Sequence, residues 1–140
     1  MLHLAIFSHG FIDKIFIGKK TIDARFSQIR CMPYGNIEKG DLVLMKKSGG
    51  PVIGYFVAGK IKFFEDLTKK RLNLIVKKYR NELALSNNFW DSKKESKYLT
   101  LIQITRPAKF RIPISVKKRS LSGWVSLGGD NQVQIELFET

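Results

Sequence analysis

The stretch Gly18-Lys19-Lys20-Thr21-Ile22-Asp23-Ala24-Arg25 places lysine, aspartate and arginine close together in the pattern G-x-K-x-x-D-x-R. From Thr21 onward apolar and polar residues alternate, which predicts a β-strand. On that strand Thr21, Asp23 and Arg25 share one face, and the opposite face is apolar. The pattern therefore predicts a group of polar side chains that meet in one pocket.

A short amphipathic helix is expected just before this strand, over residues 8–17. Its apolar side chains recur with the spacing of one helical face: Phe11, Ile12, Ile15 and Phe16. Gly18 follows at the position where a glycine in the left-handed conformation commonly ends a helix. The motif should therefore begin in a tight turn, between a helix and a strand.

Further strands are predicted along the chain from apolar runs bounded by turn residues. Residues 41–47 and 52–61 flank Ser48-Gly49-Gly50-Pro51, which predicts a hairpin. Gly54 and Gly59 inside the second of these strands indicate bends, as a small curved barrel needs. The other strands are expected at residues 1–7, 98–105, 110–114 and 132–137.

One longer helix is expected from Leu67 to Leu85, with Asp66 or Thr68 as its N-terminal cap. Its apolar stripe is covered by basic residues, which either contact phosphates or form an ordinary solvated surface. Residues 87–91 are expected to form a loop. Its aromatic residues, including Trp90, either cover the pocket as a lid or anchor the loop to the core.

Short strands around two or so helices predict an α+β fold with a small, partly open β-barrel. The 140 residues suffice for one domain, which we expect to span residues 1–140. The formal net charge is +13, and all 25 basic residues lie within residues 1–119. Such a field attracts polyanions, so RNA or another single-stranded nucleic acid is the favoured partner over a merely solvated surface.

Several other functional classes lack their sequence features. Cys31 is the single cysteine, which excludes an intramolecular disulfide and leaves no partner base for a nucleophilic role. His3 and His9 are too few for a zinc site and are expected at the surface or as caps. Gly128-Gly129-Asp130 is expected as a hairpin turn, not a phosphate loop. We expect no metal, no cofactor, no membrane span and a cytoplasmic location.

The motif residues have chemistry suited to a pocket. A lysine enclosed near Arg25 should have a lowered pKa, and a neutral Lys20 can act as a base or attack a carbonyl. Asp23 can pair with either cation, and the planar fork of Arg25 suits a phosphate or carboxylate. From spacing alone, a surface ion-pair cluster worth at most about 1 kcal/mol per pair is an equal alternative.

The order of these features resembles the ASCH domain (activating-signal-cointegrator homology), in the PUA-like superfamily. The motif follows a helix, Gly40-Asp41 leads into a hydrophobic strand, and Ser122-Gly123-Trp124 comes later. The family signature is G-x-K-x-x-E-x-R, which this chain matches at Gly18, Lys20 and Arg25, while Asp23 replaces the glutamate. The resemblance spans most of the chain and implies a PUA-like barrel.

The resemblance also implies two kinds of activity. Some bacterial members are amidohydrolases on acylated cytidines such as 4-acetylcytidine, in which the motif lysine, here Lys20, is catalytic. A threonine and a glutamate assist it; Asp23 occupies the threonine position. The candidates for the glutamate are Glu65, Asp66 and Glu82. Other relatives are proposed to bind RNA or are reported as ribonucleases.

The interpretation we favour is a binding module in which the pocket receives a base or nucleotide while the basic surface follows the backbone. The expected contacts are Gly18, Lys19, Lys20, Thr21, Arg25, Lys117, Lys118, Arg119 and Trp124. Trp124 is the first candidate for base stacking, or otherwise a core residue, and Trp90 is the second. The alternative is a hydrolase with Lys20, Asp23 and Arg25 as catalytic residues; a protein-interaction adaptor is a third possibility.

Overall fold

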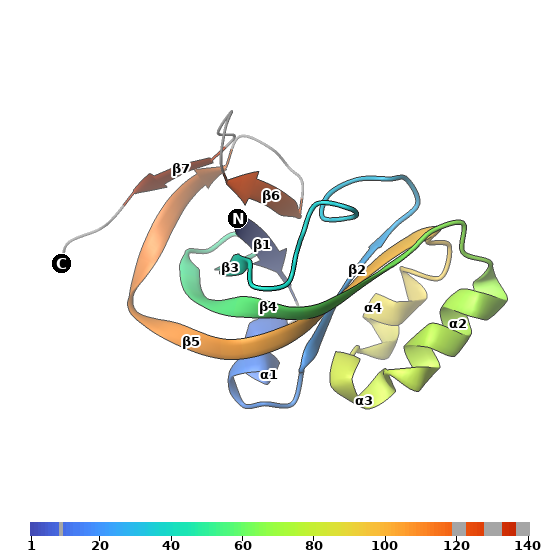
Figure 1. The fold of residues 1–140 in the computed structure, drawn as a ribbon. Helices are drawn as coiled ribbons and strands as arrows, with labels where there is room; N and C mark the ends of the chain where they lie inside the picture. Colours follow the sequence, from blue (N-terminus) through green and yellow to red (C-terminus); the bar gives the residue numbers. More distant parts are fainter. Residues whose placement is uncertain (9, 119–122, 128–132, 137–140) are drawn as a thin grey trace.

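The computed structural model describes residues 1–8, 10–118, 123–127 and 133–136 of the chain (Figure 1). Its strands are β1 Leu2–Phe7, β2 Ile22–Ser27, β3 Leu42–Lys47, β4 Val52–Phe64, β5 Tyr98–Lys118, β6 Trp124–Leu127 and β7 Val133–Glu136. Its helices are α1 Phe11–Phe16, α2 Lys69–Lys78, α3 Arg80–Leu83 and α4 Asn87–Asp91.

The strands form one mixed sheet in the order β2-β5-β4-β3-β1-β6, and β7 pairs with β5. Only the β1–β3 pairing among these is parallel. The long strands β4 and β5 curve together around the sheet, and α2, α3 and α4 gather beside the end that contains β2 (Figure 1). The expected α+β fold with a partly open barrel is confirmed.

The curvature of the sheet originates in irregular pairing between β4 and β5, whose register shifts three times. Gly54 and Gly59 lie at these places, which confirms the predicted bends. A Cβ on Gly54 would lie 2.4 Å from the carbonyl oxygen of Ala108, so only glycine permits this approach. The predicted break between residues 105 and 110 is wrong, because a bulge at Arg106 and Pro107 turns β5 without ending it.

The predicted helix over residues 67–85 is at the right place but is divided into α2 and α3 at Tyr79. Of the two proposed caps, Thr68 is correct: its hydroxyl accepts a hydrogen bond from the Arg71 amide at 3.1 Å. The apolar stripe packs on β2 and β5, where Leu72 and Leu83 are fully buried.

The expected loop at residues 87–91 is also corrected, because this segment forms the short helix α4. The hydroxyl of Ser86 caps it by accepting a hydrogen bond from the Phe89 amide at 3.3 Å. Phe89 and Trp90 both contact the ring of Phe26 on β2. These aromatic contacts anchor α4 to the sheet, beside the motif strand.

Candidate functional site

The turn after α1 determines where the motif lysine lies. Gly18 adopts φ 79°, and its amide donates to the carbonyl of Ile15 at 3.1 Å. The amide of Lys19 donates to the carbonyl of Lys14 at 2.9 Å. This pair of bonds is a Schellman motif, which confirms Gly18 as the residue that ends the helix. The next amide, of Lys20, also donates to Lys14, and the chain enters β2 with the Lys20 side chain turned inward.

Lys20 is the largest fully buried side chain among the described residues and is only 2% exposed. Its Nζ donates a hydrogen bond to the carbonyl of Leu83 at 2.6 Å and lies 4.8 Å from the centre of the Phe11 ring. The ammonium group therefore has one polar partner and one aromatic face in place of water.

Burial is the main reason that the pKa of Lys20 falls from 10.5 to about 8. The nearby charge of Asp23 opposes this shift, while Arg25 and Lys14 add to it. The predicted direction is thus confirmed, although desolvation outweighs the neighbouring cation as its cause.

Asp23, which is buried, and Arg25, which is partly buried, form an ion pair on strand β2. The Nε of Arg25 donates to Oδ2 of Asp23 at 2.8 Å, and the aspartate is 3% exposed. The Nη1 of Arg25 donates to the carbonyl of Ile6 at 2.9 Å and points toward that of Gly123 at 3.5 Å. The alternative of a surface ion-pair cluster is therefore wrong for these two residues.

Two aromatic rings lie close to this guanidinium. Its central carbon is 4.6 Å from the centre of the Phe7 ring and 5.2 Å from that of Trp124. The hydrogen bonds to Nε and Nη1 and the two nearby rings hold the Arg25 cation in place.

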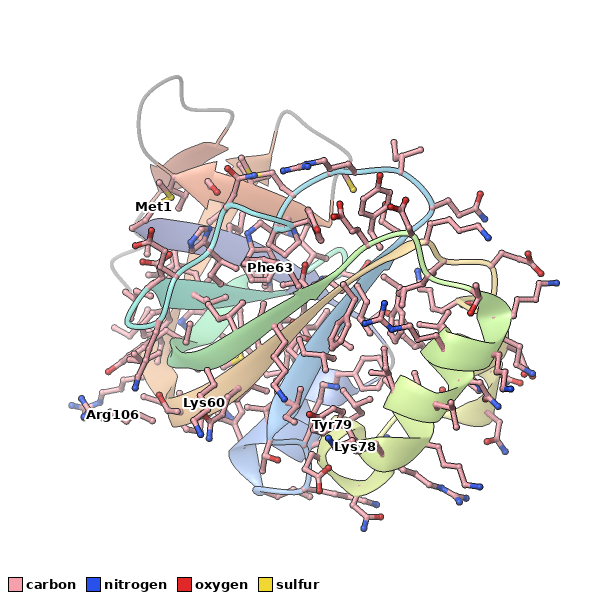
Figure 2. All side chains as sticks on the ribbon, turned by 45° about the vertical axis from the view of Figure 1, so that its right-hand side comes forward. Met1, Lys60, Phe63, Lys78, Tyr79 and Arg106 are labelled. Carbon is pink, nitrogen blue, oxygen red and sulfur yellow. The ribbon has the colours of Figure 1, made fainter. Side chains whose placement is uncertain are left out.

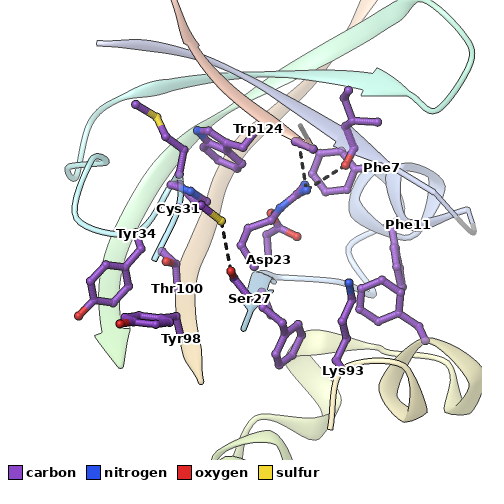
Figure 3. Close-up of a pocket in the computed structure, with 18 of the residues that line it drawn as sticks. Phe7, Phe11, Asp23, Ser27, Cys31, Tyr34, Lys93, Tyr98, Thr100 and Trp124 are labelled. Atoms are coloured by element: carbon purple, nitrogen blue, oxygen red, sulfur yellow. Dashed lines mark hydrogen bonds and ion pairs between the residues drawn. The ribbon is translucent and has the colours of Figure 1, made fainter. Parts of the chain in front are cut away.

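Lys20, Asp23 and Arg25 line a cavity of about 310 Å³, which we call the motif cavity (Figure 3). Figure 3 shows Tyr34 and Tyr98 on one side, with Phe7 and Phe11 on the other. Lys93 contributes a third cation, and Asp23 is the sole carboxylate among the lining residues. Cys31 is exposed at the cavity, with its thiol 3.2 Å from the Ser27 hydroxyl.

Trp124 is 3% exposed, as expected of a core residue, and it also lines the motif cavity, where base stacking stays a prediction. Its indole donates to Nδ1 of His3 at 3.2 Å, and Nε2 of His3 lies 2.8 Å from Asp41. Because Nδ1 accepts, the network assigns the proton to Nε2. His3 is fully buried, so its expected place at the surface is wrong.

Other predicted contacts lie outside the motif cavity. Gly18 and Lys19 are exposed and do not line it. Thr21 precedes the regular strand, and its amide donates to the backbone carbonyl of Glu82 at 2.9 Å. It lines a different hollow, so its expected place beside Asp23 is wrong. Lys117 and Lys118 lie on β5 opposite β7, and Arg119 lies outside the described residues.

Sequence reasoning missed the residues that distant elements bring to the motif cavity. Thr100 lies opposite Arg25 in the β2–β5 pairing and is 1% exposed, and Tyr98 follows the same strand face. The alternation of β5 indicates this face but not its partner strand. None of the three candidates for the assisting glutamate, Glu65, Asp66 and Glu82, lines the cavity.

Within the described residues, no three His, Cys, Asp or Glu side chains are grouped as metal ligands. The helices described there are all too short or too polar to cross a membrane.

Comparison with known proteins gives a likeness in structure but not in sequence. No protein-family model and no curated protein matches the chain. The ASCH protein of Zymomonas mobilis superposes with a TM-score of 0.63 at 16% identity, covering 81% of this chain and 73% of that one. A point mutant of it gives 0.63 at 20% identity, covering 81% and 75%. The hypothetical protein PH0355 gives 0.52 at 15% identity, covering 77% and 100%. The chain therefore has the ASCH-type fold.

Proposed function

We propose that this protein is an RNA- or nucleotide-binding module whose motif cavity holds one nucleotide. The observation that carries the proposal is the fixed cation of Arg25. Asp23 and the carbonyls of Ile6 and Gly123 hold Nε and Nη1, while Nη2 has no hydrogen-bond partner among the described residues. A planar donor fixed in this way suits a phosphate or a base carbonyl.

The size and lining of the motif cavity support the same ligand class. Its volume of about 310 Å³ lies within the range of small-molecule sites. Lys20, Arg25 and Lys93 outnumber the single carboxylate, which favours an electron-rich ligand. Aromatic rings from several elements offer faces for a base. The net charge of +13 favours a ligand that is part of a polymer.

The test is fluorescence anisotropy with labelled single-stranded RNA at two salt concentrations, with a mononucleotide as competitor. Lys93→Gln removes a cavity cation, and Lys39→Gln removes an exposed cation outside the cavity. We expect Lys93→Gln to weaken binding severalfold more than Lys39→Gln. Equal weakening by both variants, or no competition by the mononucleotide, would contradict a nucleotide in the motif cavity.

A second candidate function, hydrolysis, is favoured by the lowered pKa of Lys20. With its pKa lowered to about 8, part of the Lys20 population is neutral near pH 7.5, whereas an ordinary lysine is almost fully charged there. In this candidate mechanism neutral Lys20 takes a proton from water, and the oxygen attacks the acyl carbon of an acylated cytidine. The C–N bond then breaks, and the departing nitrogen takes the proton back from Lys20. Asp23 holds Arg25 in place.

Incubation with 4-acetylcytidine tests the hydrolase directly. Acetate release should rise with pH around an apparent pKa near 8 and disappear in Lys20→Met. An RNA oligonucleotide incubated in parallel tests the ribonuclease form of the same candidate. If both substrates remain intact, the hydrolase is excluded, and the proposal of a binding module is unaffected.

A further inference from the structure

A second basic hollow lies on the other side of α4 from the motif cavity. One part, of about 370 Å³, is lined by Lys69, Lys70, Asn73, Trp90 and Lys94. An adjoining part, of about 230 Å³, is lined by Asn73, Val76, Lys77, Arg80, Leu83, Leu85, Ser86, Asn87 and Trp90. Both parts share Asn73 and Trp90, so they adjoin between α2 and α4, and we call the two together the α2–α4 groove. In Figure 1, α4 lies between α2 and β2.

The charges that line the α2–α4 groove are all positive: Lys69, Lys70, Lys77, Arg80 and Lys94. Glu95 and Asp91 reach two of them from outside the groove, at 2.8 Å from Lys69 and Lys94. All four side chains of these pairs are more than half exposed, so solvent screens the pairs and a phosphate can replace the carboxylates. Figure 2 shows nitrogen-tipped side chains around the outer side of α2.

Trp90 and Asn73 give the middle of the groove a different chemistry. The half-buried indole of Trp90 packs on the Phe26 ring, with their centres 6.0 Å apart. Its N–H has no hydrogen-bond partner among the described residues, and the Asn73 side chain is exposed. An anchored aromatic ring flanked by cations on both sides is the arrangement that single-stranded nucleic acids use for stacking and backbone contact.

The α2–α4 groove and the motif cavity adjoin through α4 and the segment after it. Phe89 and Lys93 line the cavity, whereas their sequence neighbours Trp90 and Lys94 line the groove. Phe26 lines the cavity and also supports Trp90. A single-stranded nucleic acid with one nucleotide in the motif cavity would therefore reach the α2–α4 groove by crossing α4.

We propose that the α2–α4 groove binds the backbone of a single-stranded nucleic acid, with phosphates on its lysine and arginine side chains and one base against Trp90. This deepens the proposed function and rests on it for the ligand class. The proposal gives a role to the basic helix and to Trp90, which the motif cavity alone leaves unused.

The chain provides one tryptophan reporter for each site, because its only two tryptophans are Trp90 in the groove and Trp124 in the cavity wall. The probes are a uridine mononucleotide, a 12-residue oligouridine and the matching oligothymidine. We expect the oligomers to quench a signal that Trp90→Phe removes, and the mononucleotide to leave that signal unchanged. Trp90→Ala should weaken oligomer binding about 5- to 150-fold, the range for loss of one stacked base.

The salt dependence of binding measures the phosphate contacts. Each contact to a single strand contributes about 0.7 to the slope of log K against log salt concentration. The double variant Lys77→Gln/Arg80→Gln should therefore lower that slope by about 1.4. The control Lys39→Gln/Lys109→Gln removes two exposed charges that line neither site and should keep the slope.

The outcomes separate the two proposals. Equal affinity for the mononucleotide and the oligomers, with no quenching of Trp90, would overturn the proposal that the groove binds nucleic acid. The proposal of a nucleotide in the motif cavity would be unaffected. Oligomer quenching of Trp90 that Lys93→Gln does not alter would support the groove and overturn the nucleotide in the cavity. Quenching of Trp90 by polyglutamate as strong as by the oligomers would overturn a nucleic-acid site. The ratio of the affinities for oligouridine and oligothymidine then gives the preference for RNA or DNA.

Discussion

The motif cavity and the α2–α4 groove both present lysine and arginine, but the two regions hold these charges differently. In the cavity, Lys20 is buried and Arg25 is fixed by an aspartate, two carbonyls and two rings. In the groove, the cations are exposed, and two of them have only weak partners at the surface.

The two arrangements suit different tasks: a fixed cation orients a ligand, whereas exposed cations attract it. A cation that is enclosed and held at part of its edge has little freedom to adapt, so it suits a ligand of matching shape and hydrogen bonding. Exposed cations adapt to any phosphate spacing and contribute affinity that salt weakens. The comparison predicts that replacing Lys20 or Arg25 in the cavity changes stability and that replacing the exposed lysines of the groove does not.

The largest effect is expected from Arg25→Ala, which leaves Asp23 buried without its cation. Breaking such a pair should lower the free energy of unfolding by about 4 kcal/mol, measured by urea denaturation. Arg25→Lys keeps the charge but loses the planar fork and should lose less. An unfolding midpoint unchanged in Arg25→Ala would place the pair among ordinary surface contacts.

The next effect is a pH dependence from Lys20. Its folded pKa of about 8 lies below the unfolded value of 10.5, so between these pH values the unfolded chain binds more protons. Stability should therefore rise with pH across this window by about 3 kcal/mol relative to Lys20→Met, in which the rise is absent. Parallel curves for both proteins from pH 8 to 10.5 would show that Lys20 titrates normally.

A smaller effect is expected from Gly18→Ala, which tests the turn that places Lys20. At φ 79° an alanine costs about 1 kcal/mol, and its Cβ would meet no atom within 4 Å. The backbone conformation is thus the sole source of the loss. Lys19→Ala, one residue further on and exposed, is the matched control and should unfold like the wild type.

The smallest effect on stability is expected in the groove. Lys70→Gln and Lys77→Gln should leave the urea midpoint at the wild-type value, because these side chains are exposed and free of acidic partners in the described structure. Lys20→Gln, the same chemical change in the cavity, should lower it. A comparable loss at Lys70 or Lys77 would remove the distinction between the two regions.

The local part of the site was predictable because local chemistry determines it. An apolar helix face, a glycine with a left-handed backbone and an alternating strand follow one another within residues 11–26, and they place Lys20, Asp23 and Arg25. The curved sheet was also predictable, from Gly54 and Gly59.

The remainder depends on contacts between distant segments. Thr100, Lys93 and Phe7 reach the cavity through strand pairing and helix docking, which no local pattern specifies. The division of the predicted helix at Tyr79 is similar. The apolar stripe continues through Tyr79, but its backbone leaves the helical conformation there, at φ −103° and ψ 19°. Its hydroxyl accepts a hydrogen bond from Lys62 of β4 at 2.8 Å. Only the folded arrangement brings that lysine near.

The position of β1 between β3 and β6 has a consequence for synthesis. Its partners lie about 40 and 120 residues further along the chain, and Gly123 and Trp124 close one wall around Arg25. A ribosome releases the N-terminal residues first, so a nascent chain that ends before Gly123 lacks this wall. The wall around Arg25 therefore forms only after the ribosome has synthesised β6.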